Sequence, residues 1–222
     1  MLDYAKPEVV AAIVEPGDVL VLVSGTEFGQ RFPQHANVIT AARDAGVSRI
    51  VYTSAPKATT SELLVAPEHK ATEEFLIASG VPFTILRNGW YTENYVDQIS
   101  TGRQSGEIVA SVGDGKVASA SRADYADAAA VALMDDSLAG QTFELSGDHA
   151  WDFDELASTI AALTGTEVTF RNVTPSEHTE ILTAFGLEQA TIGFVVGLDG
   201  NIRDGLLGGT SGDLSAGQGG DC

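Results

Sequence analysis

Three short apolar runs, separated by segments with helical periodicity, constrain the fold of this chain most strongly. The runs cover residues 18–23, 49–53 and 83–86. Continuous apolar runs of this length are typical of strands that are buried on both faces of a parallel sheet. The intervening segments, residues 34–45 and 67–79, each place apolar residues on one helical face and are followed by a glycine. This β-α-β-α-β order predicts an α/β fold with a doubly wound parallel sheet and right-handed crossovers.

The alternation changes near residue 104. There, two short apolar segments flank Gly113-Asp114-Gly115, which predicts a hairpin. Ser121 to Asp124 resembles a capping box and opens an alanine-rich helix to about Met134. The later elements are a strand at 142–145, a helix at 153–163, a strand at 168–172 and helices at 176–185 and 188–196. We therefore predict a sheet domain over 1–104, a substrate-side subdomain over 105–198 and a glycine-rich flexible tail over 199–222.

Charge and cysteine content exclude several classes of function. The chain has 31 acidic and 12 basic residues, a formal net charge of −19, which disfavours binding to nucleic acid and to anionic membranes. Its one cysteine is Cys222, and its four histidines show no metal-ligand spacing, so no metal site is predicted. No apolar run reaches 18 residues and no signal peptide is evident, which favours a cytoplasmic protein without membrane insertion.

Polar and aromatic side chains gather where the third apolar run ends, over residues 86–95. In an open α/β sheet, ligands bind beyond the carboxyl ends of the strands. The three strand ends together bring these residues to one crevice: Ser24, Gly25, Thr53, Ser54, Arg87, Asn88, Trp90, Tyr91 and Asn94. Hydroxyls, amides and an arginine suit a ribose and a nicotinamide or flavin carboxamide, and the aromatic rings suit a flat acceptor. The alternative to a binding site at residues 86–95 is a polar loop with a packed tryptophan.

The helix that begins at Pro67 directs His69 or Lys70 toward the same crevice, where a proton donor would be useful. The alternatives are a solvated His69 and an i,i+4 pair of Lys70 with Glu74. Two dehydrogenase signals are absent from the sequence. It has no Tyr-x-x-x-Lys pair and no glycine-rich phosphate-binding turn near its start, and the segment 25–29 is a weak imitation that follows the wrong strand.

Several segments together match a known pattern. They are Phe28–Arg31 with Pro33–His35, Ile50–Ser54, Glu68-His69 with Thr72-Glu73, Leu86–Tyr95, Gly113–Lys116 and Ala118–Tyr125. They resemble the NmrA-like branch of the atypical short-chain dehydrogenases, and within it the NAD(P)H:quinone oxidoreductase type 2 group, over roughly residues 3–215. The resemblance implies a Rossmann-like doubly wound parallel sheet with a small C-terminal α+β substrate subdomain. It also implies NADPH (or NADH) as cofactor and a small quinone as partner, and leaves a homodimer open.

The resemblance also implies roles for individual residues. The cofactor would be approached by Ser24, Gly25, Thr53, Ser54, Arg87 and Asn88. The quinone would be bordered by Asn88, Gly89, Trp90, Tyr91 and Asn94, with His69 as proton relay and Asn88 and Tyr91 as its catalytic neighbours. Hydride would pass directly from nicotinamide to quinone, so catalysis is mainly alignment and exclusion of water. Two alternatives to a reductase remain. One is a non-catalytic NmrA-like sensor of nucleotide redox state with a regulatory partner, and the other is a degenerate fragment.

One departure from the family pattern concerns the start of the chain. The family opens with strand–GATGxxG–helix, whereas this sequence begins about where the family's third strand finishes. We therefore expect residues 1–104 to form a partial NAD(P)-binding Rossmann domain without its first βαβαβ portion. We also expect the strand at 19–23 to lie at an exposed sheet edge. The chain alone is expected to bind NADPH poorly or not at all, and micromolar binding in a nicotinamide fluorescence titration would contradict this.

Overall fold

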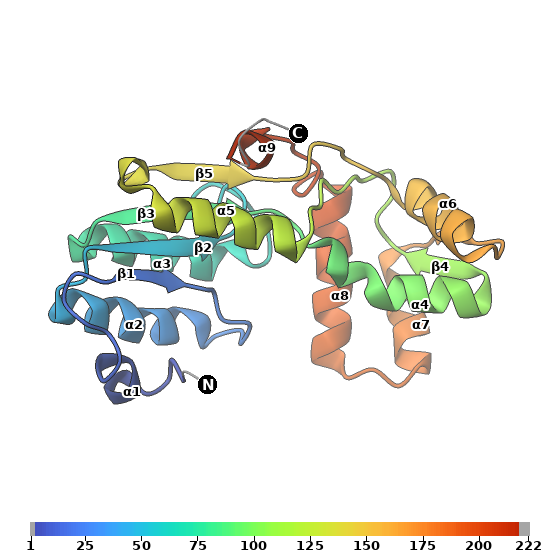
Figure 1. Ribbon diagram of the computed structural model, residues 1–222. Coiled ribbons are helices and arrows are strands. Elements are labelled where there is room, and N and C mark those ends of the chain that lie inside the picture. Colours follow the sequence, from blue (N-terminus) through green and yellow to red (C-terminus); the bar gives the residue numbers. More distant parts are fainter. Residues whose placement is uncertain (1–2, 218–222) are drawn as a thin grey trace.

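A four-stranded parallel sheet forms the centre of the first lobe (Figure 1). The computed structural model describes residues 3–217. The strand order is β1 (Val19–Leu22), β2 (Arg49–Ser54), β3 (Phe83–Asn88) and β5 (Thr142–Leu145). All six residues of β2 are buried, as expected of a central strand with helices on both sides. The predicted parallel α/β sheet is confirmed.

Helices cover both faces of this sheet. The helices α2 (Arg31–Ala45) and α3 (Ala66–Ser79) pack on one face, with α1 (Pro7–Ala11) against α2. On the other face lie α5 (Arg122–Met134) and the short α9 (Asp213–Gly217), and the turn η2 (Asp136–Leu138) connects α5 to β5. Side chains alternate across the sheet. Tyr52 joins the apolar cluster under α2 and α3, and its neighbour Val51 joins the cluster under α5.

The second lobe is built around a two-stranded parallel sheet of β4 (Glu107–Ala110) and β6 (Thr169–Asn172). Its other elements are η1 (Thr92–Tyr95), α4 (Val96–Ser105), α6 (Phe153–Thr164), α7 (Pro175–Ala184) and α8 (Gln189–Arg203). Tyr95, Ile108, Phe153 and Ile202 belong to one buried cluster that joins these elements. No helix in residues 3–217 is both long and apolar enough to cross a bilayer.

The predicted hairpin around Gly113-Asp114-Gly115 is wrong. The strand before it, β4, pairs with β6, and Val117 after it bridges to Trp151. The glycine-rich turn instead packs against the end of α8: a Cβ on Gly115 would lie 2.3 Å from the carbonyl oxygen of Ile202. Tertiary packing of the turn therefore overrides its local preference for a hairpin.

The predicted domain boundaries also require correction. The chain returns to the first lobe after residue 105, because α5 packs on the main sheet and β5 pairs with β3. The predicted tail is ordered up to residue 217: α8 continues to Arg203, and Leu207 and Leu214 are buried. Glycines there allow close backbone packing, as where Gly208 approaches the carbonyl oxygen of Lys116. Residues 218–222 of the predicted tail lie outside the described residues.

Strand β1 occupies one edge of the sheet, as predicted. It pairs with β2 on one side, and no strand among residues 3–217 pairs with its other side. Val23, directly after the strand, is 57% exposed. The edge strand is four residues long, which limits the number of unpaired backbone groups that it presents.

Candidate active site

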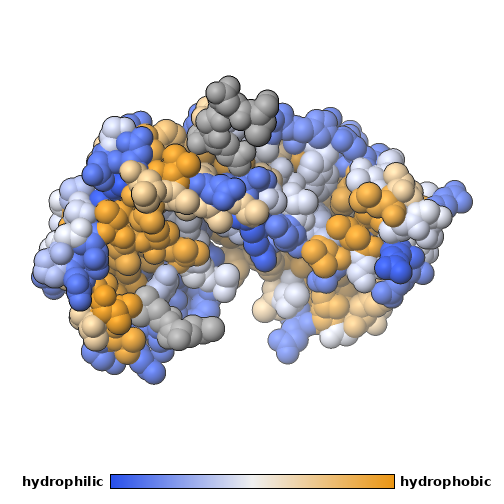
Figure 2. Space-filling view, viewed as in Figure 1, coloured by the Kyte–Doolittle hydropathy of each residue, from blue (hydrophilic) through white to orange (hydrophobic). Residues whose placement is uncertain are grey.

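A cavity of about 960 Å³ lies beyond the carboxyl ends of β1, β2 and β3. Its walls come from the loop after each of these strands, from the first turns of α3 and α5, and from Phe194 of α8 in the second lobe. The space-filling view shows the molecule hollowed between the two lobes (Figure 2). An apolar arm of the cavity runs along Val21, Val23, Ala126 and Ala129, between β1 and α5. The cavity therefore occupies the position at which parallel α/β sheets bind ligands.

Nearly all the residues predicted from the sequence meet in this cavity. The residues that line it are Ser24, Gly25, Thr53, Ser54, His69, Asn88, Gly89, Trp90, Tyr91 and Asn94. Arg87 does not line it. Its guanidinium lies on the α3 side of the sheet, where Nε and Nη2 donate to Glu73 at 2.9 and 2.7 Å and Nη1 donates to Glu144 at 2.8 Å. The structure therefore places the Arg87 side chain outside the cavity, contrary to the expectation that it lies at the same crevice as the other site residues.

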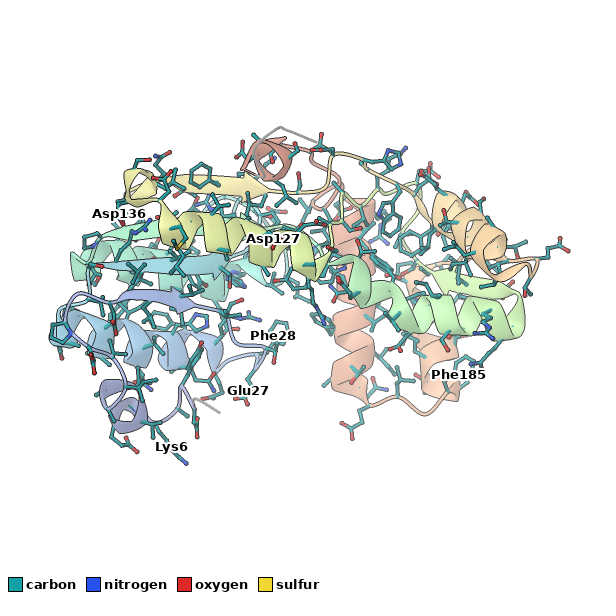
Figure 3. The ribbon with its side chains drawn as sticks, in the orientation of Figure 1. Lys6, Glu27, Phe28, Asp127, Asp136 and Phe185 are labelled. Carbon is teal, nitrogen blue, oxygen red and sulfur yellow. The ribbon has the colours of Figure 1, made fainter. Side chains whose placement is uncertain are left out.

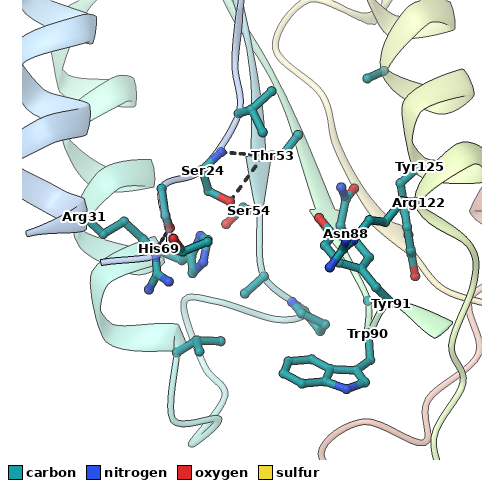
Figure 4. A pocket seen from close by; sticks show the side chains of 18 of the residues that line it. Ser24, Arg31, Thr53, Ser54, His69, Asn88, Trp90, Tyr91, Arg122 and Tyr125 are labelled. Carbon is teal, nitrogen blue, oxygen red and sulfur yellow. Dashed lines mark hydrogen bonds between the residues drawn. The ribbon is translucent and has the colours of Figure 1, made fainter. Parts of the chain in front are cut away.

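One wall of the cavity is the loop after β1, whose backbone is held by side chains (Figure 4). The amide of Ser24 donates to Thr53 Oγ1 at 2.9 Å, and the amide of Gly25 donates to His35 Nε2 at 2.9 Å. The carbonyl oxygen of Gly25 accepts from Arg31 Nε at 2.7 Å. Both polar groups of the Gly25 backbone are thus fixed from α2, which leaves the loop ordered before any ligand arrives.

His35 holds Gly25 as a neutral imidazole. Because Nε2 accepts from an amide, the ring proton lies on Nδ1, which donates to Thr72 Oγ1 at 3.1 Å. The Thr72 hydroxyl in turn donates to the carbonyl oxygen of Glu68 at 2.8 Å. Burial, and then the charge of Arg31, lower the pKa of His35 to about 4. The acceptor at Nε2 is therefore present throughout the neutral pH range.

His69 reaches the cavity from the first turn of α3 and contacts Tyr52 behind it. The phenol oxygen of Tyr52 lies 2.7 Å from His69 Nδ1. Burial raises the pKa of Tyr52, so the phenol keeps its proton and donates to Nδ1. Burial, followed by the charge of Arg31, lowers the pKa of His69 to about 3. His69 is therefore a neutral imidazole that carries its proton on Nε2.

On the opposite wall, the buried amide oxygen of Asn88 has no hydrogen-bond partner within residues 3–217. The Tyr125 hydroxyl lies nearby, beside the backbone of Gly89 and Ala120. Asn88 and Tyr125 both line the cavity (Figure 4). Unpaired buried polar atoms are rare and costly in folded proteins. A ligand that supplies a donor would satisfy the Asn88 oxygen.

Several cavity residues carried no sequence signal for a site. Phe28, in the loop between β1 and α2, projects toward the second lobe (Figure 3), and its ring centroid lies 5.2 Å from that of Phe194. Arg31 lies beneath Phe28, with its guanidinium carbon 5.2 Å from the ring centroid. Arg122 and Tyr125 fall in the segment Ala118–Tyr125, which indicates a helix start and the family resemblance but assigns neither residue to the site. Their roles depend on how the two lobes meet, which local patterns do not encode.

Comparison with known proteins places the chain in a family. Residues 1–136 match a family model described as NAD(P)H-binding. The chain belongs to this NAD(P)H-binding family. One relative is quinone oxidoreductase 2 of Escherichia coli, 42% identical over 185 residues that make up 83% of this chain and 65% of the relative. Another is an NmrA-like family domain-containing oxidoreductase of Aspergillus flavus, 29% identical over 81% of this chain and 60% of the relative. The matched part of the chain thus spans less than two thirds of either relative.

Two solved structures match nearly the full length of this chain. The NADPH complex of the NADPH-dependent quinone oxidoreductase of E. coli superposes with a TM-score of 0.92 at 39% identity, over 97% of this chain and 76% of that chain. The triphenylmethane reductase of Citrobacter sp. superposes with a TM-score of 0.91 at 32% identity, over 97% and 76%. The predicted Rossmann-like architecture and the resemblance to NmrA-like proteins are both confirmed.

Proposed function

We propose that this chain carries the nicotinamide and acceptor site of an NAD(P)H-dependent quinone oxidoreductase. The observation that carries the proposal is the unpartnered amide oxygen of Asn88 in a cavity walled by Trp90 and Tyr91. The similarity to quinone oxidoreductase 2 of E. coli supports the same assignment. Since NAD(P)H and small quinones are soluble metabolites, the proposal includes a cytoplasmic location and a quinone as small-molecule partner.

The unpartnered oxygen of Asn88 fits a primary carboxamide. The carboxamide NH₂ would donate to Asn88 Oδ1, and its carbonyl oxygen would accept from the nearby Tyr125 hydroxyl. The residues of the opposite wall, Ser24 and Thr53, offer hydroxyls to a ribose. These contacts would orient the flat ring against the acceptor wall, and orientation of this kind supplies a large part of the rate in hydride transfer.

Reduced nicotinamide supplies two electrons as hydride when it is bound. The acceptor must also receive one proton, because a quinone becomes a hydroquinone by gaining a hydride and a proton. His69 is the candidate proton relay: its Nε2–H can donate a hydrogen bond toward the cavity while Nδ1 accepts from the Tyr52 hydroxyl. The raised pKa of Tyr52 keeps the phenol protonated, so the proton that completes the hydroquinone would come from solvent, and His69 would stabilise the developing negative charge on the acceptor oxygen.

Aromatic side chains give the site its shape. Trp90 and Tyr91 supply flat faces against which a quinone ring can pack. Phe28 and Phe194, in contact across the two lobes, restrict access of water to the same space. A dry cavity strengthens the hydrogen bonds at Asn88 and limits loss of hydride to solvent.

A turnover assay tests the proposal. The full chain is mixed with NADPH at millimolar concentration, because weak cofactor binding is expected, and with a small neutral benzoquinone, and consumption of the reduced nicotinamide is followed. We expect quinone-dependent turnover with a primary isotope effect from 4-deuterated NADPH, and a loss of about tenfold or more in Asn88→Leu, in which the acceptor is removed. Cofactor binding in calorimetry without turnover would contradict the proposal and favour a non-catalytic sensor.

A further inference from the structure

The charge of the cavity is opposite in sign to that of the protein. The chain carries a formal net charge of −19. Among the described residues that line the cavity, the only charged side chains are two arginines, Arg31 and Arg122, and there is no carboxylate. A local positive potential inside an acidic molecule attracts anionic ligands to that point and to few others on the surface.

Arg31 is already committed to the protein. It is 5% exposed, its Nε donates to the Gly25 carbonyl oxygen, and its Nη1 pairs with Glu68 Oε2 at 3.3 Å. Its charge is therefore compensated, and its geometry is explained by the loop that it holds. The second arginine is different.

Arg122 stands at the start of α5 with its charge directed to the cavity. Its guanidinium carbon lies 5.3 Å from the centre of the Tyr91 ring, and Nη2 donates to Asn94 Oδ1 at 3.4 Å. The nearby carboxylate of Glu93 accepts from the backbone amide of Arg122, at 2.9 and 3.0 Å. Within residues 3–217, the guanidinium forms no salt bridge, and the exposed side chain lines the cavity.

The contacts of Arg122 also place it on the acceptor side. Tyr91 and Asn94, which hold it, follow β3, whereas Ser24, Thr53 and Arg31 form the opposite wall (Figure 4). A guanidinium that stacks on an aromatic face keeps its in-plane donors available for a carboxylate or sulfonate. A planar ligand that packs on Trp90 could extend such a group toward Arg122.

We propose that Arg122 is a specificity-determining residue that binds an anionic oxygen group on the acceptor, so that the site prefers planar acceptors with an acidic substituent. The inference rests on the proposed function, since it assigns this wall to the acceptor. It adds a substrate class: quinones and related flat oxidants that bear a carboxylate or sulfonate.

Ligand binding tests this directly, without cofactor. Anthraquinone-2-carboxylate and anthraquinone-2-carboxamide have nearly the same shape and differ in charge, and each is titrated into the full chain by calorimetry. We expect the carboxylate to bind about tenfold more tightly, as one charge-assisted hydrogen bond supplies. Arg122→Gln should remove this preference and leave carboxamide affinity within about twofold. Arg103→Gln, an exposed arginine on α4 outside the cavity, should retain it.

Other outcomes overturn the inference. Equal affinity of the wild-type chain for the two ligands would show that the acceptor site does not select charge. Equal weakening of both ligands in Arg122→Gln would indicate a structural role. Weakened NADPH binding with an unchanged carboxylate preference would assign Arg122 to a cofactor phosphate. The proposed function fails separately, by absence of turnover with a neutral benzoquinone.

Discussion

At the residue scale, Gly89 is a position in the acceptor wall where neighbouring segments leave no room for a side chain. A Cβ there would lie 2.9 Å from both the Leu145 carbonyl oxygen and the Tyr125 phenol oxygen. The amide of Gly89 also donates to that same carbonyl at 2.7 Å. Both neighbours are fixed by β5 and α5, so a methyl group would have to displace the backbone.

We therefore expect Gly89→Ala to lower the free energy of unfolding by about 1–3 kcal/mol, as overpacking does, and to weaken ligand binding in the cavity. Urea denaturation and calorimetry measure the two effects. Gly193→Ala is the matched control, because no atom lies within 4 Å of its Cβ position in α8, and there alanine should stabilise by about 1 kcal/mol at most. Equal stability of Gly89→Ala and the wild type would refute this account.

Arg87 and Asn88 show why the sequence predicts which residues gather at the site but not which way each points. The apolar run ends at Leu86, and residues beyond a strand are free to face the crevice. The structure extends β3 to Asn88, so the pleat still applies. Asn88 then faces the cavity, and Arg87 faces α3, where Glu73 binds it. An error of two residues in the strand boundary thus changed the assignment of Arg87.

At the scale of elements, a buried ion pair joins α3 to three strands. Glu73 is 1% exposed, receives both Nε and Nη2 of Arg87, and accepts from the Ser54 hydroxyl at 2.5 Å. Arg87 also donates to Glu144, which lies in β5. Removal of one charge from such a group leaves the other charge only partly compensated in a region of low dielectric.

Glu73→Gln should therefore destabilise the fold by about 3 kcal/mol or more. The neighbouring Glu74→Gln, at an exposed position of the same helix, should change stability by less than about 0.5 kcal/mol. Urea midpoints of the two variants give the comparison. Because Glu73 and Arg87 lie outside the cavity, Glu73→Gln should retain its ligand affinity under conditions where it is folded. A large loss would show that this ion pair acts on the site, through Arg87 or through Ser54, which donates to Glu73 and lines the cavity.

The elements themselves were predictable where their signal is local. The boundaries of α3 and β2 lie within one residue of the sequence prediction, since apolar periodicity and a terminal glycine define them. The order of residues 199–217 was not predictable in the same way. Glycines there serve close contacts with other segments, such as Gly208 beside Lys116, and composition alone does not separate this use from flexibility.

At the scale of the whole molecule, two histidines buried between α2, α3 and β2 make the free energy of unfolding depend on pH. His35 and His69 are 0% and 5% exposed, and burial with the nearby charge of Arg31 lowers the pKa of His35 to about 4 and that of His69 to about 3. In the unfolded chain each imidazole titrates near its ordinary value of about 6.5. Between these values the unfolded chain binds protons that the folded chain does not.

The free energy of unfolding should therefore fall as the pH decreases from about 6.5 toward 4, by up to about 1.4 kcal/mol per pH unit for each histidine. Urea denaturation at a series of pH values measures this slope. His69→Gln should reduce this slope by about half of the histidine contribution. The difference between the variant and the wild type distinguishes the contribution of the imidazoles to the slope from that of the carboxylates. His149→Gln, at a position where the side chain is 70% exposed, controls for loss of a surface imidazole. If His69→Gln keeps the full slope, then His69 is protonated in the folded chain and cannot serve as the neutral Nε2–H donor of the relay.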